Sequence, residues 1–253
     1  MGEEVIEAIE GHRFAGQYIE PMTLLSRLPS VCAVCHGWGR SRICADCLRR
    51  HVVTRPRCGT CAIQVPEGVP TCGACLRNPP PFVHGVAAVD YRFPWSQLVT
   101  AFKFHAALDL APALAAVLVA AVRASGQALP ALVLPVPLSP ERLAERGMNQ
   151  AWELSRRLAS MLGVEARADV LARWIDTPHL ADLPREARAA RIRGAFGIAP
   201  GRQAPLRGRR VALVDDVMTS GATAAEAARV LLAGGATEVA VWVVARTPLP
   251  GDA

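Results

Sequence analysis

Short apolar runs alternate with longer segments of helical periodicity along the last two-thirds of the chain. Four runs are typical of strands buried in a sheet: GVAAVDYRF (85–93), ALVLPVPLS (131–139), RVALVDDV (210–217) and EVAVWVVAR (238–246). Between them the pattern predicts helices over residues 95–105 and 110–126, a helix that Asn149 caps and Gly163 ends, and a last helix that ends at GGAT (234–237). Strands that alternate with helices predict an α/β fold: a mostly parallel sheet with helices on both faces and ligands at the carboxyl ends of its strands.

The cysteines are confined to a separate stretch of the sequence. All eight lie between Cys32 and Cys75, and the three prolines at residues 79–81 cannot continue a helix or a central strand. We therefore expect an N-terminal tail over residues 1–29, a small cysteine module over residues 30–78, and the α/β domain over residues 82–248. Because 51% of the 253 residues are hydrophobic, the α/β part can bury a full core.

The cysteines form four Cys-x-x-Cys pairs: Cys32/Cys35, Cys44/Cys47, Cys58/Cys61 and Cys72/Cys75. Two thiolates on one tight turn can occupy two corners of a tetrahedron, so four pairs predict two structural zinc ions, each bound by four cysteines. Short loops favour tandem sites, with the first two pairs in one and the last two in the other, while an interleaved arrangement stays open. Disulfides are the alternative. The acidic start of the chain, MGEEVIEAIEG, shows no export signal and favours reduced thiols.

The apolar run at residues 211–214 ends in two adjacent carboxylates, Asp215 and Asp216. A buried strand gains nothing from two such charges, but they can accept hydrogen bonds from two ribose hydroxyls and help to place Mg²⁺. In the loop beyond them, backbone N–H groups and hydroxyls can bind a phosphate, and Gly221 lets the backbone approach it closely. An ordinary strand, turn and helix cap explains only part of this series. The candidate phosphate-binding residues are Val217, Met218, Thr219, Ser220, Gly221, Ala222 and Thr223.

The stretch VALVDDVMTSGAT (211–223) resembles the phosphoribosyl pyrophosphate motif of type I phosphoribosyltransferases. From about residue 30 onward the chain is similar to the ComF family, and the similarity includes YRFPWSQLVTAFKFH, VLPVPLSPERLAERGMNQA, RWIDTPHLADLPREARAARIRGAF and VVAR. The resemblance implies a double zinc ribbon followed by a type I phosphoribosyltransferase-like domain. It also implies a competence protein of DNA uptake in natural transformation, with helicase-like and recombination partners.

The same resemblance assigns further residues to the site. The loop after the second apolar run would face the pyrophosphate, with cations nearby. These candidates are Val136, Pro137, Ser139, Arg142, Arg146, Lys103 and Arg188. Thr177–Pro178 would lie in a hood over the site, where His179, Asp182 and Arg191 depart from the family pattern.

Charge adds a second possible partner. The formal net charge of +6 says little, because eight thiolates on two zinc ions change it by −8 + 4 = −4, to about +2. The arginines between Arg185 and Arg210 are dense, however, and predict either a solvated basic face beside a phosphate site or a surface for single-stranded DNA. Aromatic side chains that could stack on bases are few: Trp38, Tyr91, Phe93 and Trp95.

Two functions stay open at this point. One is a protein of DNA uptake that binds phosphoribosyl pyrophosphate and single-stranded DNA. The other is an active Mg²⁺-dependent phosphoribosyltransferase of nucleotide or base metabolism with no DNA role, although the sequence shows no pocket for an acceptor base. The longest apolar run, residues 110–122, is shorter than the roughly 20 residues that cross a bilayer, so we expect a cytoplasmic protein without a membrane span.

Overall fold

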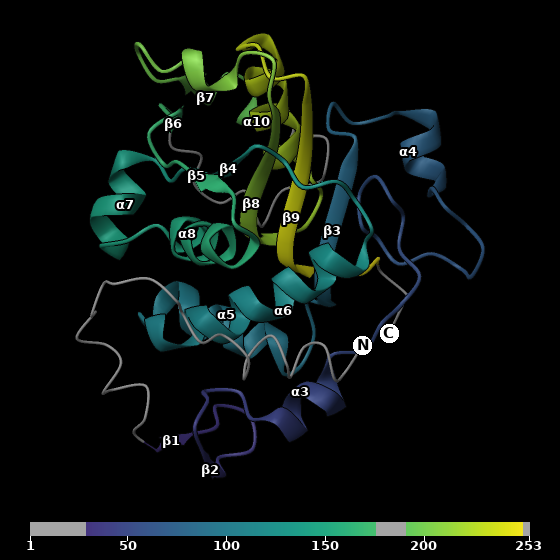
Figure 1. Ribbon diagram of the computed structural model, residues 1–253, viewed down its shortest axis with the longest axis vertical. Coiled ribbons are helices and arrows are strands. Elements are labelled where there is room, and N and C mark those ends of the chain that lie inside the picture. The colour runs from purple at the N-terminus through teal and green to yellow at the C-terminus, as the bar shows by residue number, and fades with distance from the viewer. Residues whose placement is uncertain (1–28, 176–190, 250–253) are drawn as a thin grey trace.

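The computed structural model describes residues 29–175 and 191–249 (Figure 1). Apart from Pro29, the predicted N-terminal tail therefore lies outside the described residues. Within the described ranges, no helix is both long and apolar enough to cross a membrane.

Five parallel strands form the central sheet. They are β3 (His84–Asp90), β4 (Leu132–Pro135), β5 (Glu165–Ala166), β8 (Arg210–Met218) and β9 (Glu238–Arg246). The order across the sheet is β3-β9-β8-β4-β5, and each pairing between neighbours is parallel. The four predicted strands are thus present, and their carboxyl ends meet at one edge of the sheet.

Helices occupy the predicted segments. They are α5 (Trp95–Phe104), α6 (Ala111–Ala124), α8 (Gln150–Leu162) and α10 (Ala222–Ala233). Asn149 caps α8, since its Oδ1 accepts hydrogen bonds from the backbone N–H groups of Ala151 at 2.9 Å and Trp152 at 3.4 Å. Gly163 ends the same helix in the left-handed region, with a φ of 69°. Both predicted ends of α8 are confirmed.

Side chains that alternate along each strand pack against helices on the two faces of the sheet. Val214 and Trp242 lie in one core with α6 and α8, whereas Leu213 and Val243 lie in another core with α10. This is the period of two that a strand imposes on its side chains. The predicted fold class is confirmed: a parallel sheet with helices on both faces, preceded by a small cysteine module (Figure 1).

Several short elements have no counterpart in the predicted pattern. Helix α7 (Pro140–Arg146) follows β4, and strands β6 (Leu171–Arg173) and β7 (Phe196–Ile198) pair in an antiparallel two-stranded sheet. Glu226 of α10 holds the chain before β7, because its buried carboxylate accepts a hydrogen bond from the backbone N–H of Gly194 at 2.8 Å. A local hydrophobic pattern cannot indicate a pairing between segments so far apart.

The first half of the cysteine module docks on the helices. The module contains β1 (Ser30–Val31), β2 (Trp38–Gly39), α3 (Ala45–His51) and α4 (Gly73–Arg77). Figure 1 shows α3 beneath α5 and α6, and α4 beside β3. The indole Nε1 of Trp95 donates a hydrogen bond to the carbonyl of His51 at 2.9 Å, and Cys32 and Leu48 lie in the same core as α6.

The second half of the module docks on β3, at the edge of the sheet. The backbone N–H of Gly85 donates to the carbonyl of Gly59 at 3.0 Å, and Arg57 pairs with Asp90 at 2.9 Å. A Cβ on Gly85 would lie 2.5 Å from the carbonyl oxygen of Thr60, so only glycine allows this close approach. The cysteine module therefore docks on the α/β domain at two separate places, one on helices α5 and α6 and one on strand β3.

Replacing Gly85 by Ala should loosen the second of these contacts, because the added methyl group meets the backbone of Thr60. We expect a loss of about 1–3 kcal/mol in the free energy of unfolding, measured by urea denaturation. Gly39→Ala is the matched control, since a Cβ there meets no atom within 4 Å. Equal stability of the two variants would contradict close docking of the module on β3.

Candidate functional site

The two predicted carboxylates lie near the end of β8. Asp216 is only 3% exposed, and its backbone N–H donates to Oδ1 of Asp215 at 2.8 Å. The ammonium of Lys103, near the end of α5, lies 2.8 Å from Oδ1 of Asp216. The fold thus brings Lys103 to the two predicted carboxylates, from which it is far apart in the sequence.

The pKa values of Asp215 and Lys103 are both shifted at this site. Burial, and after it the charge of Asp216, raises the pKa of Asp215 to about 7, although Lys103 acts in the opposite direction. Burial lowers the pKa of Lys103, but the attraction of Asp216 and Asp215 outweighs it and leaves the pKa raised. One cation therefore faces two carboxylates, and Mg²⁺ or sugar hydroxyls would compensate the remaining charge.

The chain beyond the carboxylates turns into the start of α10. Gly221 is the N-cap of this helix, with a φ of 79° in the left-handed region that favours glycine. A glycine N-cap offers no side-chain oxygen to the first turn of the helix. The N–H groups of that turn and the helix dipole favour an anion. The predicted phosphate-binding residues, 217–223, form the end of β8, this turn and the first two residues of α10.

The loop after β4 lies next to β8. The backbone N–H of Val136 donates to the backbone of β8 at 2.8 Å, and Nδ2 of Asn149 donates to the carbonyl of Val136 at 3.1 Å. Ser139 is fully buried, and its hydroxyl caps α7 by accepting a hydrogen bond from the backbone N–H of Arg142. The predicted loop residues, Pro137 included, are thus held beside the carboxylate strand.

A pocket of about 370 Å³ opens beside Lys103. Its lining residues are Lys103, Phe104, Ala106, Arg142, Glu145, Arg146 and Met148. The guanidinium of Arg146 lies 4.9 Å over the ring of Phe104, and its Nη1 donates to Oε1 of Gln150 at 3.3 Å. Three of the predicted cations therefore share one pocket. Arg188, and the predicted hood at Thr177–Pro178, lie outside the described residues.

Two groups of four cysteines in the described part of the chain have sulfur atoms close enough to share a metal ion. The first cysteine group is Cys32, Cys35, Cys44 and Cys47, and the second cysteine group is Cys58, Cys61, Cys72 and Cys75. All Sγ atoms of a group lie within 4.8 Å of one another, and the Sγ atoms of Cys61 and Cys72 are 3.7 Å apart. A tetrahedron with zinc–sulfur bonds of about 2.3 Å has edges of about 3.8 Å. Both groups therefore fit zinc, in the tandem arrangement and with free thiols.

Backbone N–H groups support each cysteine group. The N–H of Cys44 donates to Sγ of Cys32 at 3.4 Å, and the N–H of Cys72 donates to Sγ of Cys58 at 3.3 Å. Burial raises the pKa of the Cys32 thiol, but N–H groups, that of Cys35 first, outweigh it and lower the pKa to about 6. The same balance lowers the pKa of Cys58 to about 7. Each group thus contains one thiol that readily becomes a thiolate, the form that binds zinc.

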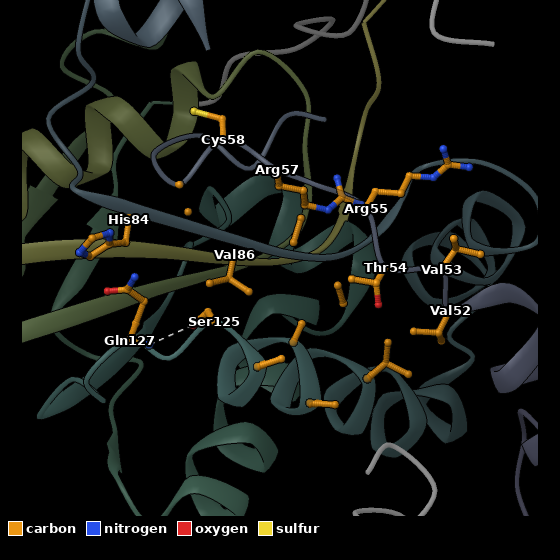
Figure 2. Close-up of a pocket in the computed structure, with 18 of the residues that line it drawn as sticks. Val52, Val53, Thr54, Arg55, Arg57, Cys58, His84, Val86, Ser125 and Gln127 are labelled. Atoms are coloured by element: carbon orange, nitrogen blue, oxygen red, sulfur yellow. Dashed lines mark hydrogen bonds between the residues drawn. The ribbon is translucent and has the colours of Figure 1, made fainter. Parts of the chain in front are cut away.

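Another pocket of about 370 Å³ lies between the cysteine module, β3 and the end of α6 (Figure 2). Val86 is part of its apolar wall, and Arg55, Arg57 and His84 lie around it. Arg55 and Arg57 share the single carboxylate of Asp90, at 3.4 and 2.9 Å, which compensates only one of their two positive charges. This pocket contains neither the carboxylates nor residues 217–223, the predicted phosphate-binding residues, which we call the phosphate loop. We do not assign the pocket to the site.

Sequence reasoning missed two residues of the site. Arg246, the last residue of β9, is 7% exposed and donates to the carbonyl of Met218 at 2.9 Å. Phe104 is 62% exposed beside Lys103. Asp215 was predicted as a site residue because a charge follows an apolar run in the sequence. Arg246 follows an apolar run in the same way, so the same argument could have predicted it.

Two expectations about surface residues are wrong. Trp95 cannot stack on a base, because it is 3% exposed and hydrogen-bonded to the cysteine module. The end of the basic stretch does not lie beside the phosphate loop: Arg210 begins β8 and Met218 ends it, which separates them by roughly 26 Å at about 3.3 Å per residue. Arg210 instead donates to the carbonyl of Leu129 at 3.1 Å.

Curated relatives match most of the chain. The sequence is 35% identical over 232 residues to "DNA utilization protein YhgH" of Salmonella typhi, which covers 87% of this chain and 98% of the relative. It is 32% identical over 222 residues to "Competence protein F" of Haemophilus influenzae, which covers 85% of this chain and 96% of the relative. The chain belongs to the ComF family.

Solved structures resemble this ComF protein only in part, and no family model matches its sequence. One is a glutamine phosphoribosylpyrophosphate amidotransferase from B. subtilis complexed with ADP and GMP, with a TM-score of 0.32 and 18% identity over 53% of this chain. Another is an allosteric regulatory enzyme of purine biosynthesis, with a TM-score of 0.32 and 20% identity. The ComF chain spans 25% of each of those chains, and a likeness of this strength carries no argument about function.

Two single substitutions should separate the roles of the carboxylates. Between an unfolded pKa of about 4 and the folded pKa of about 7, the folded protein keeps a proton on Asp215 that the unfolded chain has lost, so stability falls as pH rises through this window. Asp215→Asn should therefore raise the melting temperature at pH 8 by about 2–4 °C, the effect of about 1 kcal/mol, and raise it clearly less at pH 5, where only part of this window has been crossed.

Asp216→Asn should instead lower the melting temperature at pH 8, because it removes the partner of Lys103 at 2.8 Å. Scanning calorimetry of the ligand-free variants at both pH values measures these changes. An equal effect of Asp215→Asn at pH 5 and pH 8 would contradict the raised pKa of Asp215.

Proposed function

We propose that this chain is a competence-type DNA-utilisation protein with a phosphoribosyl pyrophosphate site and a surface for single-stranded DNA. Relatives of the chain are named for DNA utilization and for competence. The observation that carries the site is the pair Asp215 and Asp216, followed by a glycine turn at the N-terminus of α10 and flanked by a pocket of cations. On the family resemblance we further propose a cytoplasmic location and helicase-like and recombination partners.

Three parts of the ligand match three parts of the site. Asp215 and Asp216 accept hydrogen bonds from two ribose hydroxyls and help to hold Mg²⁺, which prefers one or two carboxylates plus ligand oxygens and water. The turn at residues 219–223 holds the 5′-phosphate through N–H groups and hydroxyls. The pocket that Lys103, Arg142 and Arg146 line takes the pyrophosphate.

Lys103 links the ligand-free and the ligand-bound forms of this site. Without ligand, its ammonium pairs with Asp216 at 2.8 Å. A metal ion at the carboxylates competes for the same oxygens, and the ammonium can then turn to the pyrophosphate in the adjoining pocket. The cation that compensates the carboxylates in the empty site thus becomes a ligand contact when Mg²⁺ replaces it.

The same residues suit cleavage of the anomeric bond. That reaction develops positive charge on the ribose and negative charge on the leaving pyrophosphate. In the proposed complex, Asp215 and Asp216 lie on the side of the ribose, and Lys103 and the arginines lie on the side of the pyrophosphate, where Mg²⁺ adds further compensation.

An active phosphoribosyltransferase without a DNA role is the second candidate function, favoured by the exposed ring of Phe104 in the pocket wall. Release of pyrophosphate on addition of free bases would identify it.

Substitutions in the two halves of the site should impair ligand binding differently. In calorimetric titrations, replacing Asp215 and Asp216 together by Asn should weaken Mg²⁺-dependent binding of phosphoribosyl pyrophosphate at least about tenfold, since each tenfold corresponds to about 1.4 kcal/mol. Gly221→Val should weaken binding of ribose 5-phosphate as well, because it strains the turn at the phosphate.

Gly126→Val is the matched control for Gly221→Val. Gly126 also has a positive φ, of 65°, and lies in open space away from the site. The control should show the cost of backbone strain in stability without a loss of affinity. Wild-type affinity in the double Asn variant would defeat the assignment of the carboxylates.

Exposed arginines and aromatic rings support the single-stranded DNA part of the proposal. Arg191 and Arg193 are exposed just before β7. Trp38 and Phe93 are 79% and 65% exposed and are available to stack on bases. Arg202, by contrast, pairs with Asp169 at 3.2 Å. We therefore place the main contacts with DNA phosphates at Arg191 and Arg193.

Binding of single-stranded DNA should depend steeply on salt. With roughly four phosphate contacts, affinity should fall about 50-fold between about 50 and 200 mM salt in a filter-binding assay. Replacing Arg191 and Arg193 by Ala should weaken binding and flatten this dependence, whereas Arg202→Ala should weaken binding less, because Arg202 shares the carboxylate of Asp169 with Arg167. Affinity that does not change with salt would remove DNA binding from the proposed function.

A further inference from the structure

Arg246 connects the second cysteine group to the phosphate loop. Its Nε donates to the carbonyl of Cys61 at 2.9 Å. Its Nη1 donates to the carbonyl of Met218 at 2.9 Å and to that of Thr247 at 3.0 Å, and it also contacts the carbonyl of Thr219. A single buried side chain therefore bridges a predicted metal ligand and the residues at which the phosphate loop begins.

The guanidinium makes this bridge stiff. It is planar, so its Nε and Nη1 ends move together, and it stays charged at any physiological pH. Arg246 is 7% exposed, and a buried donor that loses its acceptor is unfavourable because water cannot replace that acceptor. A shift of the Cys61 carbonyl must therefore displace the guanidinium or break a hydrogen bond at the start of the phosphate loop.

The Cys61 end of the bridge is fixed by its surroundings and by the cysteine group. Ala62 is fully buried, with a φ of 55°, and its carbonyl accepts a hydrogen bond from Nη1 of Arg57 at 3.1 Å. The Sγ atoms of Cys61 and Cys72 are 3.7 Å apart, a separation that suits two thiolates on one zinc ion. Zinc would tie these two sulfur atoms to those of Cys58 and Cys75, whereas without a metal only a weak sulfur–sulfur contact joins Cys61 to Cys72, so the turn that carries the Cys61 carbonyl is held less firmly.

The first cysteine group has different neighbours and provides an internal control. It packs in the core beneath α5 and α6, next to the contact between Trp95 and His51. Cys44 and Cys72 occupy equivalent positions, since each begins a short helix and donates its N–H to the first cysteine of its group. Comparing the two positions separates loss of a metal ligand in general from loss of the bridge to the loop.

We propose that Arg246 is a positioning residue through which the metal at the second cysteine group sets the shape of the phosphate loop. The identity of the loop's ligand rests on the function proposed above. Coupling of this kind is reciprocal: if the metal strengthens ligand binding, the ligand strengthens metal binding by the same factor. The second cysteine group is then a part of the phosphoribosyl site and not only a support for the fold.

Hydrogen exchange of the amides of residues 218–223, without any ligand, tests the bridge directly. Arg246→Lys keeps the charge but cannot donate from two separate nitrogens, so these amides should exchange faster than in the wild type. Cys72→Ser should have the same effect. Cys44→Ser, and Arg123→Lys at an exposed arginine that donates to the carbonyl of Met161, should leave them unchanged. Unchanged exchange in both Arg246→Lys and Cys72→Ser would overturn the proposal.

Zinc release from the wild-type chain supplies the reciprocal measurement and does not depend on how well any variant folds. With a colorimetric chelator, phosphoribosyl pyrophosphate plus Mg²⁺ should slow the loss of one of two zinc equivalents roughly fivefold or more and leave the other unchanged. Arg246→Lys should abolish the difference. Equal protection of both equivalents would contradict the bridge. If the wild type fails to bind the ligand while exchange responds as expected, the proposed ligand is wrong and the bridge stands.

Discussion

Charge held in apolar surroundings at the carboxyl edge of the sheet is the constraint on which the rest of the structure depends. Strands β8 and β9 are covered on both faces, yet β8 carries Asp215 and Asp216 near its end and β9 ends in Arg246. Such groups must be paired or hydrogen-bonded to remain there. Lys103 pairs with Asp216, and Arg246 donates to the carbonyls of the loop. Helix α5 must therefore stay docked, and the loop must stay closed on β9.

The cysteine module supports both of these cations. A segment of this size cannot bury a sufficient core of its own, and apolar residues of its first half, Ile43 and Leu48, join the core of the sheet domain. Its first half holds the start of α5 through the hydrogen bond from Trp95 to His51, and α5 carries Lys103 near its other end. Its second half meets Arg246 through the carbonyl of Cys61. The second half thus meets the buried Arg246 directly, whereas the first half holds the opposite end of the helix that carries Lys103.

Local pattern and spacing were enough to predict the framework. The four apolar runs are parallel strands, and Asn149 and Gly163 lie at the two ends of a helix as predicted. The Cys-x-x-Cys spacing predicted the two compact groups of sulfur atoms. These features depend on neighbours within a few residues. The pair of Asp215 and Asp216 was recognisable as a site because charge interrupts an apolar run, but the pairing of Lys103 with Asp216 needs the fold.

Features that depend on tertiary contacts were missed for the same reason. Strands β6 and β7 pair although a long polar segment separates them in the sequence. Trp95 was predicted to be available for stacking, but the cysteine module covers its ring. Arg210 belongs to a dense run of arginines in the sequence. It lies at the start of β8, however, and the extended strand places it far from the carboxylates near the end of β8. Arg246 ends an apolar strand as the carboxylates do, and its role is visible only because Cys61 and Met218 converge on it.

The ligand-free site keeps an electrostatic imbalance that its ligand would remove. Burial and the neighbouring Asp216 raise the pKa of Asp215 to about 7, so ionising this carboxyl group in the empty site costs free energy. A divalent cation reverses that cost, since it favours the carboxylate and expels the proton. If the proposed metal-bound ligand binds there, the stability that this cost removes from the empty protein is regained on binding, and the affinity would rise with pH until Asp215 has lost its proton. The charge that destabilises the strand end is thus the charge on which the proposed binding site depends.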